Sequence, residues 1–235
     1  MTTPTIVTRS QWLQARRELL SEEKAFTRQR DALSARRRQL PWVRVEEDYR
    51  FQTGGGEKSL ADLFGTAGQL IIQHFMLGDD WDAGCPSCSF WADGYDGTIV
   101  HMNQRDAAFV VVSAAPLEQI EAFKARMGWR FEWVSSQGSR FNRDFHVSFT
   151  EAEMRAGEVE YNYAKTTFPV SEAPGASIFI KADDGTVYHT YSCYARGLDM
   201  LNVTYQYLDL LPNGRGEDDL PHPMAWVRRH DEYGA

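Results

Sequence analysis

The 235-residue sequence has only three cysteines, no long apolar run and a deficit of positive charge. No stretch approaches the roughly 18 consecutive apolar residues of a transmembrane helix, so no membrane is expected as a partner. The opening residues, MTTPTIVTRSQW, lack the apolar core of a secretory signal. We therefore expect a cytoplasmic, reducing location, where a close cysteine pair is more often catalytic or metal-binding than a structural disulfide.

The deficit of positive charge limits which kinds of molecule the protein can bind. The 25 Lys and Arg stand against 33 Asp and Glu, which gives a formal net charge of −8. Nucleic acid is not expected as a partner, because phosphate binding needs a basic surface. The hydrophobic content of 43% and charged content of 25% are typical of a folded chain. The length suits one good-sized domain, with or without an accessory arm.

The positive charge that is present is concentrated near the N-terminus. Residues 8–40 hold nine Lys and Arg against four acids, a local charge of +5 that leaves −13 for the rest. Apolar side chains recur there every seven residues, at Trp12, Leu19, Phe26, Leu33 and Leu40. This predicts one helix, or two consecutive helices, with a narrow apolar stripe. We expect an N-terminal helical arm over 1–41 and a domain over 42–235. The arm packs either on its own domain or on the acidic domain of a second subunit in a homodimer.

Residues 42–235 alternate between strand and helix patterns. The apolar runs 69–77 and 107–116 are typical of strands buried on both faces, and 117–128 has helical spacing. Residues 176–191 predict two strands joined at an Asp-Gly pair. The order from residue 69 is therefore strand, helix, strand, helix, short strand, hairpin, helix. This predicts an α/β fold with a central mixed sheet flanked by helices.

Two shorter patterns complete the sequence-based fold. Residues 129–136, WRFEWVSS, alternate apolar and polar side chains and predict a strand. Residues 197–212 place Leu198, Leu201, Tyr205 and Leu208 on one face of a predicted helix.

Two of the three cysteines follow the first buried strand, in 79–94, DDWDAGCPSCSFWADG. Reactive groups in open α/β sheets lie beyond the carboxyl ends of strands. A helix N-terminus favours a thiolate, and Pro86 fits the first helical turn. We therefore expect Cys85 to be the nucleophile and Cys88, one turn further, to attack a mixed disulfide. Ser87 is small and polar and helps to hold the thiolate.

This arrangement resembles the thioredoxin-like superfamily, whose active site is Cys-x-x-Cys between a central strand and its helix. The pieces SLADLFG, LIIQHFML, GCPSCSFWAD, RDAAFVVVSAAPLEQIEAFKARMGW and GASIFIKADDGTVYHTY are similar to a bacterial family of unknown function in the peroxiredoxin-related branch. The resemblance implies a thioredoxin-like fold and dithiol–disulfide oxidoreductase activity without a cofactor. It also implies a protein or small-molecule disulfide or thiol as substrate, and a reductase that recycles the dithiol.

The sequence departs from thioredoxins around the cysteines. Gly84 stands where thioredoxins have a Trp, so Trp81 is the candidate to cover the site. Pro174 is the nearest candidate for the cis-proline of the superfamily, with an ordinary trans proline as the alternative. Arg196 either pairs with the aspartates of 79–82, steadies a thiolate, or forms a surface ion pair.

Two other functions use the same residues. A zinc or copper site could recruit four ligands, Cys85, Cys88, His189 and Cys193. Without a metal, Cys193 is either a small buried hydrophobe or a third redox partner.

A peroxiredoxin-like thiol peroxidase is the second alternative. It requires Pro-x-x-x-Thr/Ser-x-x-Cys, but Gly78 and Asp82 occupy the proline and hydroxyl positions before Cys85.

Overall fold

A single long helix accounts for most of the N-terminal part of the chain. The computed structural model describes residues 5–234, and its contacts divide the chain after Pro41 into two units. The first unit contains α1 (Arg9–Arg37), one continuous helix that Thr8 caps through a capping box. No side chain of α1 is buried. The predicted apolar stripe is therefore exposed, with Phe26 at 65%.

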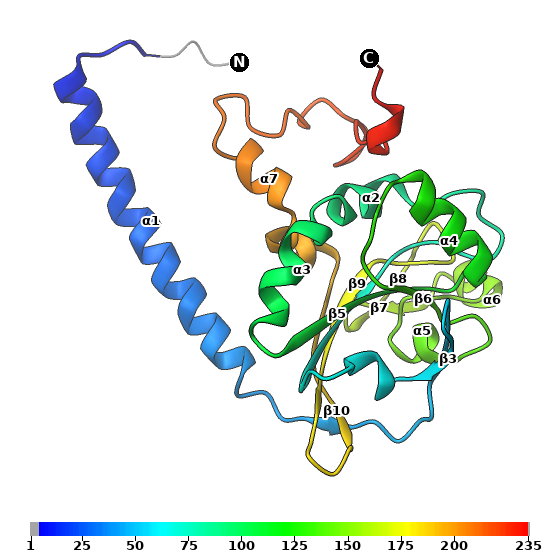
Figure 1. Cartoon of the computed structure of the whole chain (residues 1–235). Helices are drawn as coiled ribbons and strands as arrows, with labels where there is room; N and C mark the ends of the chain where they lie inside the picture. Colours follow the sequence, from blue (N-terminus) through cyan, green and yellow to red (C-terminus); the bar gives the residue numbers. More distant parts are fainter. Residues whose placement is uncertain (1–4, 235) are drawn as a thin grey trace. The chain divides into compact units, whose positions relative to one another are not determined.

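A mixed sheet forms the centre of the second unit (Figure 1). Its strands are β1 (Val43–Arg44), β2 (Arg50–Thr53), β3 (Gly56–Ser59), β4 (Gln69–His74), β5 (Ala107–Ser113), β6 (Trp133–Ser135), β9 (Gly175–Lys181) and β10 (Val187–Tyr194). They lie in the order β1-β10-β9-β4-β5-β6-β2-β3. Strands β4 and β5 are parallel, whereas β9 is antiparallel to both β4 and β10. The thioredoxin-like fold is thus confirmed, with β5-β4-β9-β10 as its centre.

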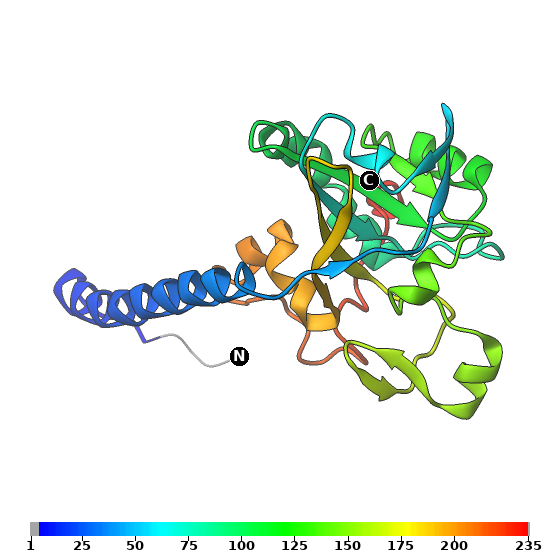
Figure 2. The same ribbon diagram turned by 90° about the horizontal axis from the view of Figure 1, so that it is seen from below.

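Helices and a small second sheet surround the central sheet. The helices are α2 (Pro86–Ala92), α3 (Tyr95–Asn103), α4 (Leu117–Arg126), α5 (Phe141–Asp144), α6 (Glu151–Ala156) and α7 (Val203–Leu208), with 3₁₀ turns η1 (Asp62–Phe64), η2 (Ala195–Leu201) and η3 (His230–Glu232). The small sheet pairs β7 (Val159–Tyr161) with β8 (Ala164–Thr166). Figure 2 shows this hairpin and α6 projecting together from the central sheet. Within residues 5–234, no helix is long and apolar enough to cross a membrane.

The two faces of the central sheet bury different clusters. On one face, Leu70 and Ile72 of β4 pack with Phe141 and Phe145 around α5. On the other face, the cluster that includes Phe75 is covered by α2, α3 and α4. Alternation along a strand sends successive side chains to opposite faces, which is why β5 supplies Val110 and Val112 to the first cluster and Val111 to the second.

Two predicted elements differ from the structure. Only residues 133–135 of the predicted strand 129–136 pair with the sheet, although its aromatic side chains are buried as the alternation indicated. The predicted helix 197–212 is divided into η2 and α7 at Asn202. The Asn202 side chain accepts a hydrogen bond from the Tyr205 N–H at 3.1 Å and so caps a new helix.

Candidate functional site

The two neighbouring cysteines lie where the chain leaves β4 and enters α2. Cys85 is the N-cap residue of α2, and Pro86 opens its first turn. The Cys85 N–H donates to the Met76 carbonyl at 3.0 Å, which holds the loop against the strand it has just left. Cys85 is partly exposed, Cys88 is only 4% exposed, and neither forms a disulfide. The site therefore presents one accessible thiol backed by one buried thiol.

The hydrogen bonds around the two sulfurs give them different acidities. The Cys88 thiol donates to the Cys85 sulfur and is the main reason why the pKa of Cys85 is lowered to about 7. Burial opposes this shift, but the N–H groups of Cys88 and Ser87 and the Ser87 hydroxyl add to it. Donating to Cys85, together with burial, raises the pKa of Cys88 well above its ordinary value. Cys85 is thus about half thiolate at pH 7, while Cys88 keeps its proton.

Close packing explains the glycine before Cys85. A Cβ atom on Gly84 would lie 2.6 Å from ring carbons of both Phe75 and Phe123. A larger residue, such as the Trp of thioredoxins, cannot occupy this position without displacing the aromatic cluster. Trp81 packs against the same cluster as Cys85, and its carbonyl accepts a hydrogen bond from Gln119. Trp81 is therefore anchored beside the site.

An arginine from the end of the chain holds the loop that carries Cys85. The Arg229 Nε donates to the Gly84 carbonyl at 2.9 Å, and Arg229 Nη1 pairs with Glu232 at 2.7 Å. The Arg229 side chain is only 17% exposed. It therefore fixes the peptide group that directly precedes the accessible thiol.

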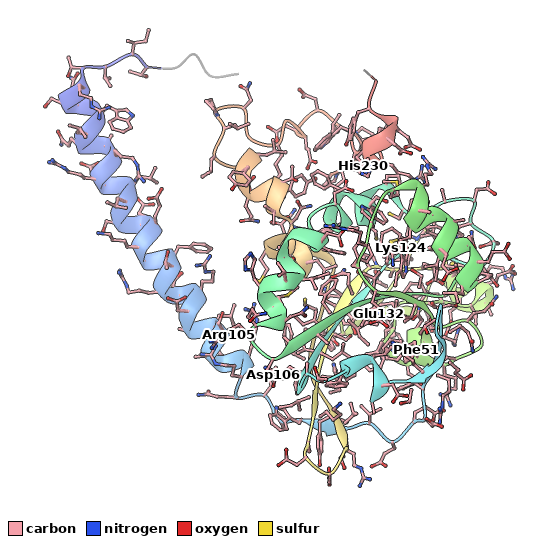
Figure 3. All side chains as sticks on the ribbon, viewed as in Figure 1. Phe51, Arg105, Asp106, Lys124, Glu132 and His230 are labelled. Atoms are coloured by element: carbon pink, nitrogen blue, oxygen red, sulfur yellow. The ribbon has the colours of Figure 1, made fainter. Side chains whose placement is uncertain are left out.

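The C-terminal segment (residues 226–232) makes further contacts with the helices around the dithiol (Figure 1). Its residue His230, labelled in Figure 3, meets Asp93 just beyond α2, with 2.6 Å between His230 Nδ1 and Asp93 Oδ1. Arg126 of α4 pairs with Asp231 at 2.7 Å. The ring of Trp226 packs edge-on against Phe90 of α2, with centroids 5.5 Å apart. The segment thus ties α2 to α4.

A buried carboxyl group lies at the same edge of the sheet, on the segment leading into β9. Glu172 is 5% exposed and accepts hydrogen bonds from Ser148 Oγ at 2.9 and 2.8 Å. Burial raises the pKa of Glu172 to about 8, and the carboxylates of Asp79 and Asp80 add to the rise. Glu172 is therefore mostly protonated at neutral pH, near the acidic loop that precedes the cysteines.

The structure decides between the alternatives for two supporting residues, Pro174 and Arg196. The peptide bond before Pro174 is trans, as are all those within residues 5–234, so Pro174 is the ordinary trans proline of the two alternatives. The Pro174 carbonyl instead accepts a hydrogen bond from the Tyr161 hydroxyl at 2.8 Å. Arg196 lies on η2, 77% exposed, and its charge meets Asp199 at 3.8 Å. Of the interpretations offered for Arg196, the surface ion pair is the one that the structure bears out.

The four ligands of the predicted metal site are not brought together. No group of three or more His, Cys, Asp or Glu within residues 5–234 is arranged to hold a metal ion. Cys88 packs on the face of the sheet that α2 covers, whereas the His189 ring packs on Phe145 and Phe179 of the opposite face. The zinc or copper prediction was therefore wrong, because the sheet itself separates the ligands. Cys193 is half-buried on β10, opposite Ala176 of β9.

A family model supplies the identification. The model described as "Bacterial protein of unknown function (DUF899)" matches residues 1–233. The chain belongs to this family. The sequence resemblance to a bacterial family of unknown function is therefore confirmed.

Solved peroxiredoxin structures are distantly similar. PrxQ of Xylella fastidiosa is 13% identical, covering 71% of this chain and 95% of its own, with a TM-score of 0.46. The peroxidoxin BcpB of Mycobacterium tuberculosis is 13% identical, with coverages of 72% and 97% and a TM-score of 0.47. The mitochondrial 2-Cys peroxiredoxin of Plasmodium falciparum is 11% identical, with coverages of 69% and 90% and a TM-score of 0.41. No curated protein matches the chain.

Sequence patterns missed Arg229 and Glu172. Arg229 could not be found from the sequence, because an arginine near a terminus has no spacing relation to a loop 145 positions earlier. Glu172 stands two residues before Pro174, which was the candidate for the cis-proline. The sequence signal for Glu172 was a charged residue just before the predicted buried strand that begins at residue 176.

Proposed function

We propose that this protein is a dithiol–disulfide oxidoreductase in which Cys85 is the attacking sulfur and Cys88 the resolving one. The observation that carries the proposal is the placement of two free thiols at the start of α2, with the partly exposed Cys85 at the N-cap and the buried Cys88 one turn along. A thiolate is the nucleophile in disulfide exchange, and the optimum attacking thiol has a pKa near the ambient pH. A pKa of about 7 at Cys85 meets this condition.

The first step consumes the thiolate. Cys85 attacks one sulfur of a protein or small-molecule disulfide, the Cys85–substrate bond forms, and the substrate S–S bond breaks. The leaving thiolate takes a proton from water. In the second step the Cys88 thiol passes its proton to water and its sulfur attacks Cys85. The Cys85–Cys88 disulfide forms, the Cys85–substrate bond breaks, and the second substrate thiolate departs and takes up a proton. The substrate gains two electrons and the protein dithiol loses two, which a thiol-donating reductase returns.

The first step also prepares the second. The largest cause of the raised pKa of Cys88 is its hydrogen bond to Cys85, and the negative charge on Cys85 contributes as well. Both effects weaken once the Cys85 sulfur is joined to substrate and carries no charge. Burial continues to raise the pKa, and the Met76 backbone contact continues to lower it. Formation of the mixed disulfide therefore makes Cys88 easier to deprotonate at the moment when it must attack.

The test is a trapping experiment with matched cysteine variants. Cys88→Ser should accumulate a mixed disulfide on Cys85 with a model disulfide such as oxidised glutathione or insulin, whereas Cys85→Ser should not. Cys193→Ala serves as the control and should cycle like the wild type. Titration against dithiothreitol buffers should show two thiols of the wild type lost together. Turnover that survives Cys85→Ser would refute the proposal, and efficient peroxide consumption in its place would favour the peroxidase.

A further inference from the structure

Two large apolar surfaces of the chain are exposed. The first, the arm stripe, follows α1 and the turn after it at seven-residue intervals, is 45% to 65% exposed at each position, and consists of Trp12, Leu19, Phe26, Leu33 and Leu40. The second, the α7 face, lies on η2, α7 and the turn after α7, is at least 46% exposed at each position, and consists of Met200, Leu201, Val203, Tyr207, Leu210 and Leu211. The two surfaces hold more than half of the large apolar side chains that are exposed within residues 5–234. Exposed apolar surface on this scale marks a site of interaction with another molecule.

The α7 face is held firmly from behind. The ring of Tyr205, on the inner side of α7, packs edge-on against Phe90 of α2 with centroids 5.4 Å apart. The Arg215 guanidinium lies 3.9 Å from the centre of the Tyr205 ring and pairs with Asp199 and Asp209 at 2.7 and 2.6 Å. These contacts fix α7, so the apolar side chains of the α7 face stay directed to solvent in a single copy.

The 29-residue helix α1 lacks the packing that stabilises most helices. A helix in a folded protein gains most of its stability from the packing of its apolar face. No side chain of α1 is buried. A single copy therefore leaves the arm stripe without the partner that such a stripe ordinarily has.

The arm and the surroundings of the α7 face carry charges of opposite sign. Residues 8–40 carry +5, whereas residues 42–235 carry −13. The segment 195–220, which contains the α7 face, carries −3 from two Arg and five Asp and Glu. Attraction therefore favours contact between an arm and the α7 face, and repulsion disfavours contact between two arms.

A coiled coil of two arms is disfavoured by the pattern of side chains as well. A coiled coil needs apolar residues at two positions of each heptad. The positions that accompany the arm stripe along α1 are Ala15, Glu22, Gln29 and Arg36, which are mostly polar. The arm stripe therefore suits the surface of a folded domain better than a second arm.

The arm stripe is large enough for a stable interface in a two-fold dimer. From Trp12 to Leu33 it is about 32 Å long, at about 1.5 Å per residue, and a helix with its side chains is about 10 Å wide. Covering it buries roughly 300 Å² on the arm and as much on the surface beneath it. Two reciprocal contacts then bury roughly 1,300 Å², which lies within the roughly 1,200–2,000 Å² of specific protein–protein interfaces.

We propose that the protein is a homodimer in which α1 of each copy packs its arm stripe on the α7 face of the other copy. Neither surface is covered within one copy. Only residues 38–42 join α1 to β1, and they include Pro41. A short link that contains proline resists folding back, so it favours exchange of the arm between two copies.

The first experiment measures the oligomeric state of the full-length protein by analytical ultracentrifugation, with dithiothreitol present so that no disulfide joins two copies. We expect the wild type at about 50 µM to sediment as a dimer of 26.8 kDa subunits. Phe26→Asp and Leu210→Asp change exposed side chains and should each weaken dimerisation at least about 100-fold, because each change occurs twice in the dimer. Ser21→Asp, exposed on the opposite side of α1, is the control and should dimerise as the wild type does. A monomeric wild type, or variants that dimerise as tightly as Ser21→Asp, would overturn the proposal.

The second experiment mixes the two defective variants in equal amounts. A Phe26→Asp copy keeps an intact α7 face and a Leu210→Asp copy keeps an intact arm, so one of the two reciprocal contacts can form between them. We therefore expect a heterodimer in the mixture although each variant alone is monomeric. Contact between two arms would instead leave Leu210→Asp dimeric by itself, and an arm that folds back on its own copy would leave the mixture monomeric. Either result would refute the exchange of arms.

Discussion

Replacing Cys88 by Ala tests the origin of the reactivity of Cys85. The Cys88 thiol is the largest contributor to the lowered pKa of Cys85, and burial acts in the opposite direction. Without the Cys88 thiol, only backbone N–H groups and the Ser87 hydroxyl still favour the thiolate. We therefore expect the pKa of Cys85 to rise from about 7 toward its ordinary value of 9.0, by at least about one unit.

The magnitude follows from the thiolate fraction. At pH 7 a full return to 9.0 would reduce the Cys85 thiolate from about half to about 1%, a loss of roughly 50-fold. A more basic thiolate is also more nucleophilic, and a Brønsted coefficient of about 0.4–0.5 recovers roughly eight-fold over two units. Disulfide exchange at pH 7 should therefore slow about six-fold in the Cys88→Ala variant, while its rate above pH 9 exceeds that of the wild type.

The assay is the pH dependence of iodoacetamide alkylation, followed by mass spectrometry of the peptide that contains Cys85. Cys88→Ser retains a hydroxyl donor and should show a smaller rise in the pKa of Cys85 than Cys88→Ala. Cys193→Ala should show none. If Cys88→Ala titrates within about 0.3 units of the wild type, the hydrogen bond between the thiols is not what activates Cys85, and the reasoning fails.

Three further changes probe the surroundings of the dithiol. Wild-type stability should fall as pH rises from about 4.5 to about 8, because the folded pKa of Glu172 is raised and the carboxyl must ionise while buried. Glu172→Gln should remove this fall and raise the free energy of unfolding in urea by on the order of 3 kcal/mol at pH 8. Gly84→Ala should lower the free energy of unfolding by about 2 kcal/mol and Tm by about 4–8 °C, because its Cβ would meet two phenylalanine rings at 2.6 Å. Arg229→Met removes the hydrogen bond to the Gly84 carbonyl and should lower the free energy of unfolding by about 1.5–3 kcal/mol. Hydrogen exchange of the Cys85 amide should become faster.

Each of these three changes has a matched control. Glu160→Gln alters an exposed carboxylate and should leave the pH profile of stability unchanged. Gly97→Ala adds a Cβ with nothing within 4 Å, in the first turn of α3, and should be neutral or stabilising. Arg228→Met removes a guanidinium whose hydrogen bonds, among residues 5–234, go to the neighbouring carbonyls of Ala225 and Val227. The first prediction is contradicted if the stability of Glu172→Gln depends on pH as that of the wild type does. The second is contradicted if Gly84→Ala is as stable as Gly97→Ala, and the third if Arg229→Met is as stable as Arg228→Met.

Hydrophobic periodicity was enough to predict the central fold. The runs 69–77 and 107–116 became the parallel pair β4 and β5, and the Asp-Gly pair became the turn between β9 and β10. Buried strands and tight hairpins are encoded by neighbours in sequence, so local patterns find them. The same patterns did not find the β7–β8 hairpin, whose turn carries Tyr163 in place of the usual glycine.

The sequence by itself determined where the two neighbouring thiols stand, because a buried strand followed by Cys-Pro favours a helix that begins at Pro86, with Cys85 at its N-cap and Cys88 one turn along α2. Only the tertiary structure decided what surrounds them. It placed Arg229 on the carbonyl before Cys85, put Glu172 near the acidic loop, and set His189 and Cys88 on opposite faces of the sheet. Contacts between residues far apart in the chain depend on how helices and loops pack over the sheet, and spacing along one sequence carries no record of that packing.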